Sequence, residues 1–533
     1  GTVALTYQIM PWLSAMGRFG MDYTHNEFET RNRPIDSLGL IDGYYGHSLS
    51  RDQVTNGEFL LVAQKENFVN SGLDVKFSFG GNSWSRTQYG LSANSGTWIQ
   101  AWVYSLNNAE RPEQRGLSEG RFEKKINSFY ALMNVGWRNY LFMELTGRQD
   151  WSSTLPKYSN NYFYPSVSFS FLPSEAFNFN KTWLSQWRIR GAYALTAIDT
   201  DPYKLDFVYS SGSFSGDKTS ALPYTIPPYS LEPQFSASWE AGTIIGLFDD
   251  RVDLNFTYYY ISSYNQIMNS PLPVSSGAGQ ITINTGELEN KGIELIINTV
   301  PISNKNFIFE AGLNFTRNRN KVVSLGEAAE IFEIANIWGG NGPAIAVKPG
   351  QDFGTIVGWD YVYHPDNNQA ILNNEGTHYL MTENRVPVGN ASPHFLAGFT
   401  TRWRWKGFML STLIDSKLGG DIYCGSYVTN VQTGQSPSTL IERQGGGLPF
   451  TDSEGNIRNI GVILPGVYAD GTPNDKVVHY YFKYMPNFGG WGRFLSKPGI
   501  LENSWIKMRE IALTYTLPPS ALQKTKFIQQ LSV

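Results

Sequence analysis

Hydrophobic and polar residues alternate along residues 236–323, and this pattern organises the prediction for the whole chain. Every second residue is apolar from 252 to 260, and the same holds from 309 to 315. A period of two over about ten residues predicts a half-buried β-strand. These strands exceed the usual length of about five or six residues. They match the roughly 9 to 11 residues that a tilted strand needs to cross a bilayer.

The same stretch contains two predicted hairpins, each made of two long strands. Asp249 and Asp250 separate the strands of the first hairpin, and residues 302–305 form the turn of the second. Polar turn residues between two alternating segments are the usual signal of an antiparallel pair. A long polar connection, residues 264–289, separates the two hairpins.

Further strands are predicted along the rest of the chain, most of them in pairs that share a short turn. The pairs are residues 2–9 with 12–29, 68–79 with 84–94 around a turn at 80–83, 126–136 with 140–148, and 164–172 with 184–195. A hairpin at 392–416 turns at 405–407, and single strands follow at 505–517 and from 527. The long connections between these pairs are residues 30–67, 95–125, 196–235, 324–391 and 418–503.

The predicted fold class is all-β: a transmembrane antiparallel β-barrel with about 16 strands in this chain, long extracellular loops and short periplasmic turns. Every second connection is long, as in an outer-membrane barrel, where the long loops gather at one end. The alternative is a large soluble β protein, such as a carbohydrate-binding sandwich or a propeller hydrolase. The chain has no repeat of about 40 to 50 residues, which argues against a propeller.

The composition agrees with this class and excludes several others. The 533 residues carry a net charge of −4, and no cluster of Lys or Arg predicts a nucleic-acid groove. No window of about 18 apolar residues predicts a transmembrane helix. The mean hydropathy of −0.29 is compatible with strands that hide their apolar face by alternation. The single cysteine, Cys424, allows no disulfide within the chain.

No motif predicts catalysis or a metal site. The six histidines are scattered, without the spacing of metal ligands. Asp199-Thr200-Asp201 and the acidic segment that begins at Asp452 lack the spacing of an EF-hand and are interpreted as polar turns. We therefore expect no cofactor and no enzymatic activity.

Five arginines are predicted on the polar faces of strands. Apolar residues occupy the opposite faces, as Trp187 and Ile189 do beside Arg188. A cation on the lipid side of a barrel costs about 2 to 4 kcal/mol at mid-depth, so these side chains are expected in the lumen, where they would favour polar or anionic cargo. The five candidate ligand-binding arginines are Arg148, Arg188, Arg190, Arg402 and Arg404.

Aromatic residues in the two longest loops are the other candidate ligand-binding residues. Flat aromatic rings stack on sugars and clamp apolar peptide side chains with little loss of entropy. The alternative is that they pack the loops against each other or against a partner. The residues are Trp338, Trp359, Tyr361, Tyr423 and Trp491.

Several motifs resemble, in order, those of one family. They are RQDWSSTLP from Arg148, LEPQFSASWEAGTIIGLFDDRVDL from Leu231, NTGELENKGIEL from Asn284, KPGQDFGTIVGW from Lys348, VPVGNASPHFLAGF from Val386, KLGGDIY from Lys417 and SWIKMREIALTYTLP from Ser504. The resemblance that they carry covers roughly residues 126–533. In their order and number they resemble the C-terminal barrel portion of a SusC/RagA-type TonB-dependent outer-membrane transporter.

The resemblance implies a function, partners and a larger protein. It implies a multi-pass protein of the outer membrane that imports a bulky oligosaccharide or oligopeptide with energy passed on by TonB. It also implies a SusD-like surface lipoprotein as lid and a dimer of such pairs. A barrel of about 22 strands would need a plug and more strands before residue 1 and a last strand after residue 533, so residues 1–533 are expected to be an incomplete barrel domain. The alternative function is a receptor or docking platform without transport.

Overall fold

The computed structural model describes residues 1–33, 36–37, 40–41, 43–68, 71–110, 116–177, 179, 183–214, 217–326, 331–337, 342–488, 495–518 and 532. The chain forms two compact units. The first comprises Gly1–Phe179, Arg188–Ala241 and Ile261–Thr285, and the second comprises Asn180–Trp187, Gly242–Tyr260 and Gly286–Val533. Among the described residues, no helix is long and apolar enough to cross a membrane.

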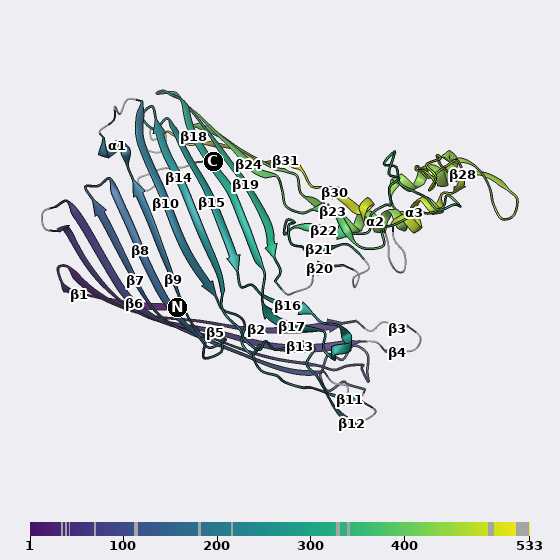
Figure 1. Ribbon diagram of the computed structural model, residues 1–533, viewed down its shortest axis with the longest axis horizontal. Coiled ribbons are helices and arrows are strands. Elements are labelled where there is room, and N and C mark those ends of the chain that lie inside the picture. The colour runs from purple at the N-terminus through teal and green to yellow at the C-terminus, as the bar shows by residue number, and fades with distance from the viewer. Residues whose placement is uncertain are drawn as a thin grey trace. The chain divides into compact units, whose positions relative to one another are not determined.

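The first unit is built on an antiparallel meander in which each strand pairs with the next (Figure 1). Its strands are β1 (Thr2–Met10), β2 (Leu13–Asn32), β5 (Tyr44–Phe68), β6 (Leu73–Asn94), β7 (Leu117–Trp137), β8 (Leu141–Ser152) and β9 (Asn161–Phe171). Strands β10 (Leu184–Ile198), β14 (Gln234–Leu247) and β15 (Val252–Tyr264) contribute residues to both units. The smaller elements are β3 (Asp36–Ser37), β4 (Leu40–Ile41), α1 (Pro173–Ala176), β11 (Ser210–Phe214), β12 (Asp217–Ala221), β13 (Thr225–Ile226), β16 (Ile267–Pro271) and β17 (Gln280–Asn284).

Two predictions for this unit are wrong. Residues 30–67 are not a polar connection, because they contain β5, a strand of 25 residues. Residues 80–83 are not a turn, because β6 runs without a break through 22 residues and pairs with β5 on one side and β7 on the other. Strand β7 also begins at Leu117, earlier than predicted. In the misjudged segments polar residues lie on both faces over most of the length, and residues 59–63 are all apolar, so the alternation that predicts a strand is absent.

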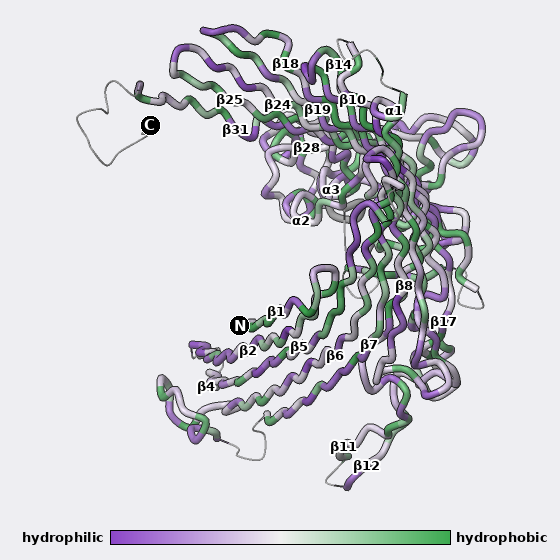
Figure 2. The backbone as a smooth tube through the Cα atoms, turned by 90° about the vertical axis from the view of Figure 1, so that its left-hand side faces the viewer, coloured by the Kyte–Doolittle hydropathy of each residue, from purple (hydrophilic) through white to green (hydrophobic). Residues whose placement is uncertain are grey.

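Large apolar side chains of the first unit gather on one face of these strands. Phe59, Phe79 and Phe129 lie on this face of β5, β6 and β7, and all three are exposed. Figure 2 shows hydrophobic and hydrophilic positions alternating along these strands. We call the exposed apolar residues of this face the apolar band: Phe19, Phe59, Leu61, Phe77, Phe79, Phe129, Met133, Met143, Leu145, Val167 and Phe169. Polar residues replace the apolar band farther along the same face, away from the short turns. These are Thr55, Ser85 and Lys125.

The second unit continues with pairs of shorter strands. They are β18 (Glu287–Ser303), β19 (Phe307–Ser324), β24 (Phe395–Trp405), β25 (Phe408–Leu418) and β31 (Trp505–Tyr515). The predicted hairpins are confirmed: β18 pairs with β19, and β24 pairs with β25 around Lys406 and Gly407. Asp249 and Asp250 adopt positive φ angles of 55° and 59°, as a tight turn requires. The second turn lies at residues 304–306, since β18 extends to Ser303. The strand predicted from residue 527 lies outside the described residues.

The two long excursions of the second unit fold into small elements of their own. These are β20 (Phe332–Asn336), β21 (Ala344–Val347), β22 (Thr355–Gly358), β23 (Val386–Asn390), β26 (Asp421–Tyr423), α2 (Gly425–Gln432), β27 (Leu448–Thr451), β28 (Ile457–Val462), β29 (Val478–His479), α3 (Tyr481–Phe488) and β30 (Ile500–Glu502). Strands β20 to β23 form one antiparallel sheet. Leu372, Leu464 and Val478 form a small core that joins the two excursions, with Tyr379 and Phe482 packed against it.

Candidate functional site

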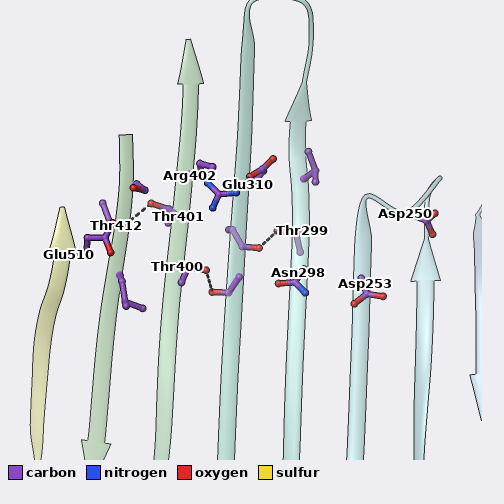
Figure 3. Close-up of a pocket in the computed structure, with 15 residues that line it drawn as sticks. Asp250, Asp253, Asn298, Thr299, Glu310, Thr400, Thr401, Arg402, Thr412 and Glu510 are labelled. Carbon is purple, nitrogen blue, oxygen red and sulfur yellow. Dashed lines mark hydrogen bonds and ion pairs between the residues drawn. The ribbon is translucent and has the colours of Figure 1, made fainter. Parts of the chain in front are cut away.

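A hollow of about 460 Å³ lies on the polar face of the second unit (Figure 3). It crosses strands β15, β18, β19, β24, β25 and β31, whose alternation directs polar side chains to this face. Gly312 makes room for Thr400, whose Oγ1 lies 2.6 Å from where a Cβ would stand. We call this hollow the polar groove; its lining includes Asp250, Asp253, Asn298, Thr299, Glu310, Gly312, Thr400, Arg402, Ser411 and Glu510.

Glu310 on β19 brings together two of the predicted arginines. Its carboxylate lies 3.1 Å from Nη1 of Arg402 and 3.2 Å from Nη2 of Arg404. All three side chains are partly exposed, so solvent screens the pairs and each contributes less than about 1 kcal/mol. The guanidinium groups are therefore compensated by a carboxylate instead of forming an isolated positive patch.

Carboxylates outnumber guanidinium groups in the polar groove. Asp253 and Glu510 lie on other strands of the same face as Glu310, and Asp250 adds a fourth carboxylate from the turn before β15 (Figure 3). A hollow lined mainly by one sign of charge attracts the opposite sign. The groove thus favours neutral polar or cationic groups, in contrast to the anionic cargo expected from the arginines. The contact between Arg402 and Glu310 was not predicted, because the two residues are 92 positions apart in the sequence and meet only through the register of their strands.

Arg148 belongs to a partly buried network in the first unit. Its Nε donates to Asp150 at 2.7 Å and its Nη2 donates to Ser128 at 2.8 Å. Tyr164 donates its hydroxyl to the other oxygen of Asp150 at 2.8 Å. The motif that begins at Arg148 continues the network, because Ser152 donates to Asp199 at 2.5 Å. Its polar residues therefore fix strands and loop to one another.

The acidic stretches serve as structural contacts. Asp199 is buried and accepts a hydrogen bond from the Lys124 ammonium at 2.6 Å. The Asp452 side chain closes its own turn by accepting from the backbone N–H of Asn456 at 2.9 Å. Within the ranges that the structure describes, no group of three potential ligands could hold a metal ion.

Arg188 and Arg190 lie on β10, two residues apart and hence on one face of the strand. Arg190 lies directly opposite Ser170 of β9, so the two side chains share one face. The residues on either side of Ser170, Phe169 and Phe171, lie on the other face, which is apolar. Both arginines are partly buried. Their placement on the polar face agrees with the expectation, and ligand contact stays a prediction.

Three of the five loop aromatics fall within the described residues, and they pack inside the loops. Trp359 is 6% exposed, with the Arg385 guanidinium 4.8 Å from its ring centre. Tyr361 meets Tyr379 edge to face at 5.0 Å, and burial raises the pKa of the Tyr361 phenol well above its ordinary range. The Tyr423 ring covers Gly499, and burial likewise raises its pKa. Trp338 and Trp491 lie outside the described residues.

A second group of loop aromatics, in the first unit, was missed. The segment between β10 and β14 exposes a series of rings, and it contains the short β11–β12 hairpin. A sequence signal exists: aromatic residues recur here among Ser, Gly and Pro without alternation. The exposed rings are Tyr203, Phe207, Tyr209, Phe214, Tyr224 and Tyr229.

An ion pair links two parts of the second long excursion. Lys483 on α3 donates to Glu442 at 2.7 Å, and the Tyr484 hydroxyl donates to the same carboxylate at 2.8 Å. Burial alone would raise the pKa of Glu442, but the hydrogen bonds from Lys483 and Tyr484 outweigh it and hold this pKa below its ordinary value. Burial would lower the pKa of Lys483, and the bond to Glu442 raises it instead.

Comparison with known proteins establishes the class. Residues 5–446 match the family described as TonB dependent receptor-like, beta-barrel. The match covers most of the chain, and the chain belongs to this family. Receptors of this family are outer-membrane proteins that transport and do not catalyse covalent chemistry. The fold class predicted from alternation and the resemblance to the SusC/RagA type are both confirmed.

The individual relatives are longer than this chain. The chain is 27% identical over 430 residues to TonB-dependent receptor P3 of Formosa agariphila, a match that covers 76% of this chain and 40% of the relative. It is 24% identical over 324 residues to SusC of Bacteroides thetaiotaomicron, covering 56% of this chain and 31% of the relative. Its fold matches that of the RagAB peptide transporter with a TM-score of 0.77 at 16% identity, covering 100% of this chain and 56% of that one.

Proposed function

We propose that the protein imports a bulky polar nutrient, an oligosaccharide or an oligopeptide, across the outer membrane with energy supplied through TonB. The observation that carries this proposal is that the strands of each unit separate an apolar face from a polar face. In the first unit the apolar band suits the hydrocarbon of a bilayer. In the second unit the polar groove suits a water-filled passage, and the same strands expose Phe399 and Trp403 on the other face. Strands that cross a membrane in this way make a multi-pass wall around the passage.

The polar groove supports a cargo rich in hydroxyl or amide groups. Asn298 and Thr400 offer neutral hydrogen-bonding groups beside the compensated Arg402. Of the candidate ligand-binding residues, Arg402 and Arg404 lie at or beside the groove, and Tyr361 and Tyr423 remain candidates in the loops. One structural relative is a peptide transporter, which supports an oligopeptide cargo, and the hydroxyl and amide groups of the groove suit an oligosaccharide as well.

The proposed partners are TonB and a SusD-like surface lipoprotein that covers the loops. The exposed rings between β10 and β14 support a protein partner, because aromatic side chains bury large areas at low entropic cost. A dimer of transporter–lipoprotein pairs is part of the same proposal. We also propose that the whole protein adds a plug and further strands to these residues, as the greater length of the relatives suggests.

Uptake in intact cells tests the proposal. Cells that carry or lack the gene are incubated with radiolabelled oligosaccharides and oligopeptides, with and without a functional TonB. Import predicts that one labelled cargo accumulates only when both the gene and TonB are present. Binding at the surface that needs the gene, without TonB-dependent accumulation, would contradict import and favour a receptor without transport.

A further inference from the structure

A hollow of about 390 Å³ interrupts the apolar band where strands β5, β6 and β7 lie side by side. Its floor is open at Gly57, where no atom lies within 4 Å of an added Cβ. Phe59 and Phe129 form its apolar walls, and Ser83 and Asn127 line its far end. The register places Gly57 opposite Ser83 and Ser83 opposite Asn127, so all three share the face of the band.

Aromatic rings give this hollow a firm apolar wall. Phe129 stacks on Phe79 with ring centres 6.2 Å apart, and it meets Phe59 edge to face at 6.3 Å. Trp151 of β8 adds a fourth ring, 6.0 Å from Phe129. Trp is typical of the level where hydrocarbon gives way to headgroups, so the hollow lies at that boundary.

The polarity of the face changes stepwise along β7 beside the hollow. Phe129, Asn127 and Lys125 follow one another on the same face, over about 13 Å in an extended strand. Ser83 donates its hydroxyl to the Asn127 Oδ1 at 2.8 Å. Among the described residues, no acceptor bonds the Asn127 amide nitrogen and no carboxylate pairs with the Lys125 ammonium. The face therefore presents an apolar wall, then an amide donor, then a cation.

We propose that this hollow binds one phosphorylated acyl lipid of the outer leaflet. The acyl chain lies over Gly57 between Phe59 and Phe129. The Asn127 amide donates to the ester or amide carbonyl that links the chain to its headgroup, and Lys125 pairs with the phosphate. The order of groups along β7 is the order of groups along such a lipid, and the lipid gives both the Asn127 amide and the Lys125 ammonium an acceptor.

The inference rests on the outer-membrane placement proposed above, but it goes beyond import. The probes are phosphatidylglycerol and diacylglycerol with the same acyl chains, added to the full-length protein in detergent. Native mass spectrometry measures the dissociation constant of the first lipid bound. Because only phosphatidylglycerol carries the phosphate, the ratio of the two constants isolates the contribution of Lys125.

Two variants and a matched control separate the parts of the site. Gly57→Leu fills the hollow, and Gly17→Leu makes the same change at a glycine that also has open space before it but does not line the hollow. Lys125→Ala removes the cation. We expect phosphatidylglycerol to bind the wild type about tenfold more tightly than diacylglycerol, as one charge-assisted contact provides.

We expect Lys125→Ala to abolish this preference, Gly57→Leu to weaken both lipids by about tenfold, and Gly17→Leu to leave both constants unchanged. Equal weakening by Gly57→Leu and Gly17→Leu would overturn the site, and so would a phosphate preference that survives Lys125→Ala. Import is measured separately as TonB-dependent uptake. A wild type that binds the two lipids equally, while TonB-dependent uptake is intact, would thus overturn this inference alone.

Discussion

The two units differ in how the chain continues after a strand has reached the length needed to cross a membrane. In the first unit, β5, β6 and β7 have 25, 22 and 21 residues and simply continue as a paired sheet. In the second unit, β24, β25 and β31 have 11 residues each, and two long excursions fold around small cores. A ladder is held by backbone hydrogen bonds at every residue, whereas an excursion depends on a few buried side chains. Single side chains should therefore matter more in the second unit.

The largest expected effect is the loss of the small core in the excursions. Leu464→Ala removes a side chain that is 1% exposed and packs with Leu372 and Val478. Truncating a buried leucine to alanine costs about 2 to 5 kcal/mol of stability. We therefore expect the excursions to open while the strands stay paired. Limited proteolysis in detergent checks this. The matched control is Leu440→Ala, at an exposed leucine of the same excursion, and equal cleavage of both variants would contradict the prediction.

A smaller effect is expected from the ion pair of the same excursion. Glu442→Gln removes the carboxylate that accepts from Lys483 and Tyr484, and losing a buried charge-assisted bond costs about 1.5 to 3 kcal/mol. Hydrogen exchange of α3 measures the local opening. Glu454→Gln, in an exposed turn, is the control and should leave the exchange of α3 unchanged.

The same ion pair gives the excursion a pH dependence. Because the pKa of Glu442 is lowered, its contribution is present above the ordinary value of 4.5 and is lost as the pH falls through the lowered pKa. Because the pKa of Lys483 is raised, its contribution is present below 10.5 and is lost as the pH rises through the raised pKa. Protection of α3, the intrinsic exchange rate at each pH divided by the observed rate, should therefore be greatest between these limits, and Glu442→Gln should flatten the acid side of this profile.

The smallest effect is expected in the extended sheet of the first unit. Asp52 on β5 accepts two bonds from Arg86 on β6, at 2.6 and 3.1 Å, but both side chains are partly exposed. Solvent screens such a pair, so Asp52→Asn should cost about 0.2 to 1 kcal/mol. Thermal unfolding, with the exposed Glu119→Gln as reference, measures the difference. A loss as large as that of Leu464→Ala would remove the contrast between the two units.

The sequence predicts strands that alternate between two sharp turns better than strands whose pattern is broken by glycines or by unbroken apolar or polar runs. The turn at Asp249 and Asp250 and the hairpin of β24 and β25 were predictable, because one face of each strand is apolar and turn residues interrupt the alternation. Strand β5 and the continuity of β6 were not, because residues 59–63 are apolar without a break and residues 80–83 are Gly-Gly-Asn-Ser, so neither segment alternates.

The candidate site was predictable only as a list of residues. Alternation placed Arg402 and Arg404 on a polar face, but their compensation by Glu310 depends on strand register and was not predictable from spacing. Trp359 lies in a loop, yet it is buried, because elements distant in sequence pack around it: Ser496 bonds to its backbone across 137 residues. Loop position alone therefore did not indicate an exposed ring.

The most direct test of the central claim, that the apolar band lies in the outer membrane, uses two positions on one face of β6. In a Cys424→Ser background, Phe79→Cys lies in the band and Thr87→Cys lies eight residues farther along the same face. Intact cells are treated with a membrane-impermeant maleimide, and both cysteines are labelled after denaturation as a reference. A band that lies in the outer membrane predicts rapid labelling of Thr87→Cys and none of Phe79→Cys. Equal labelling of both would contradict it.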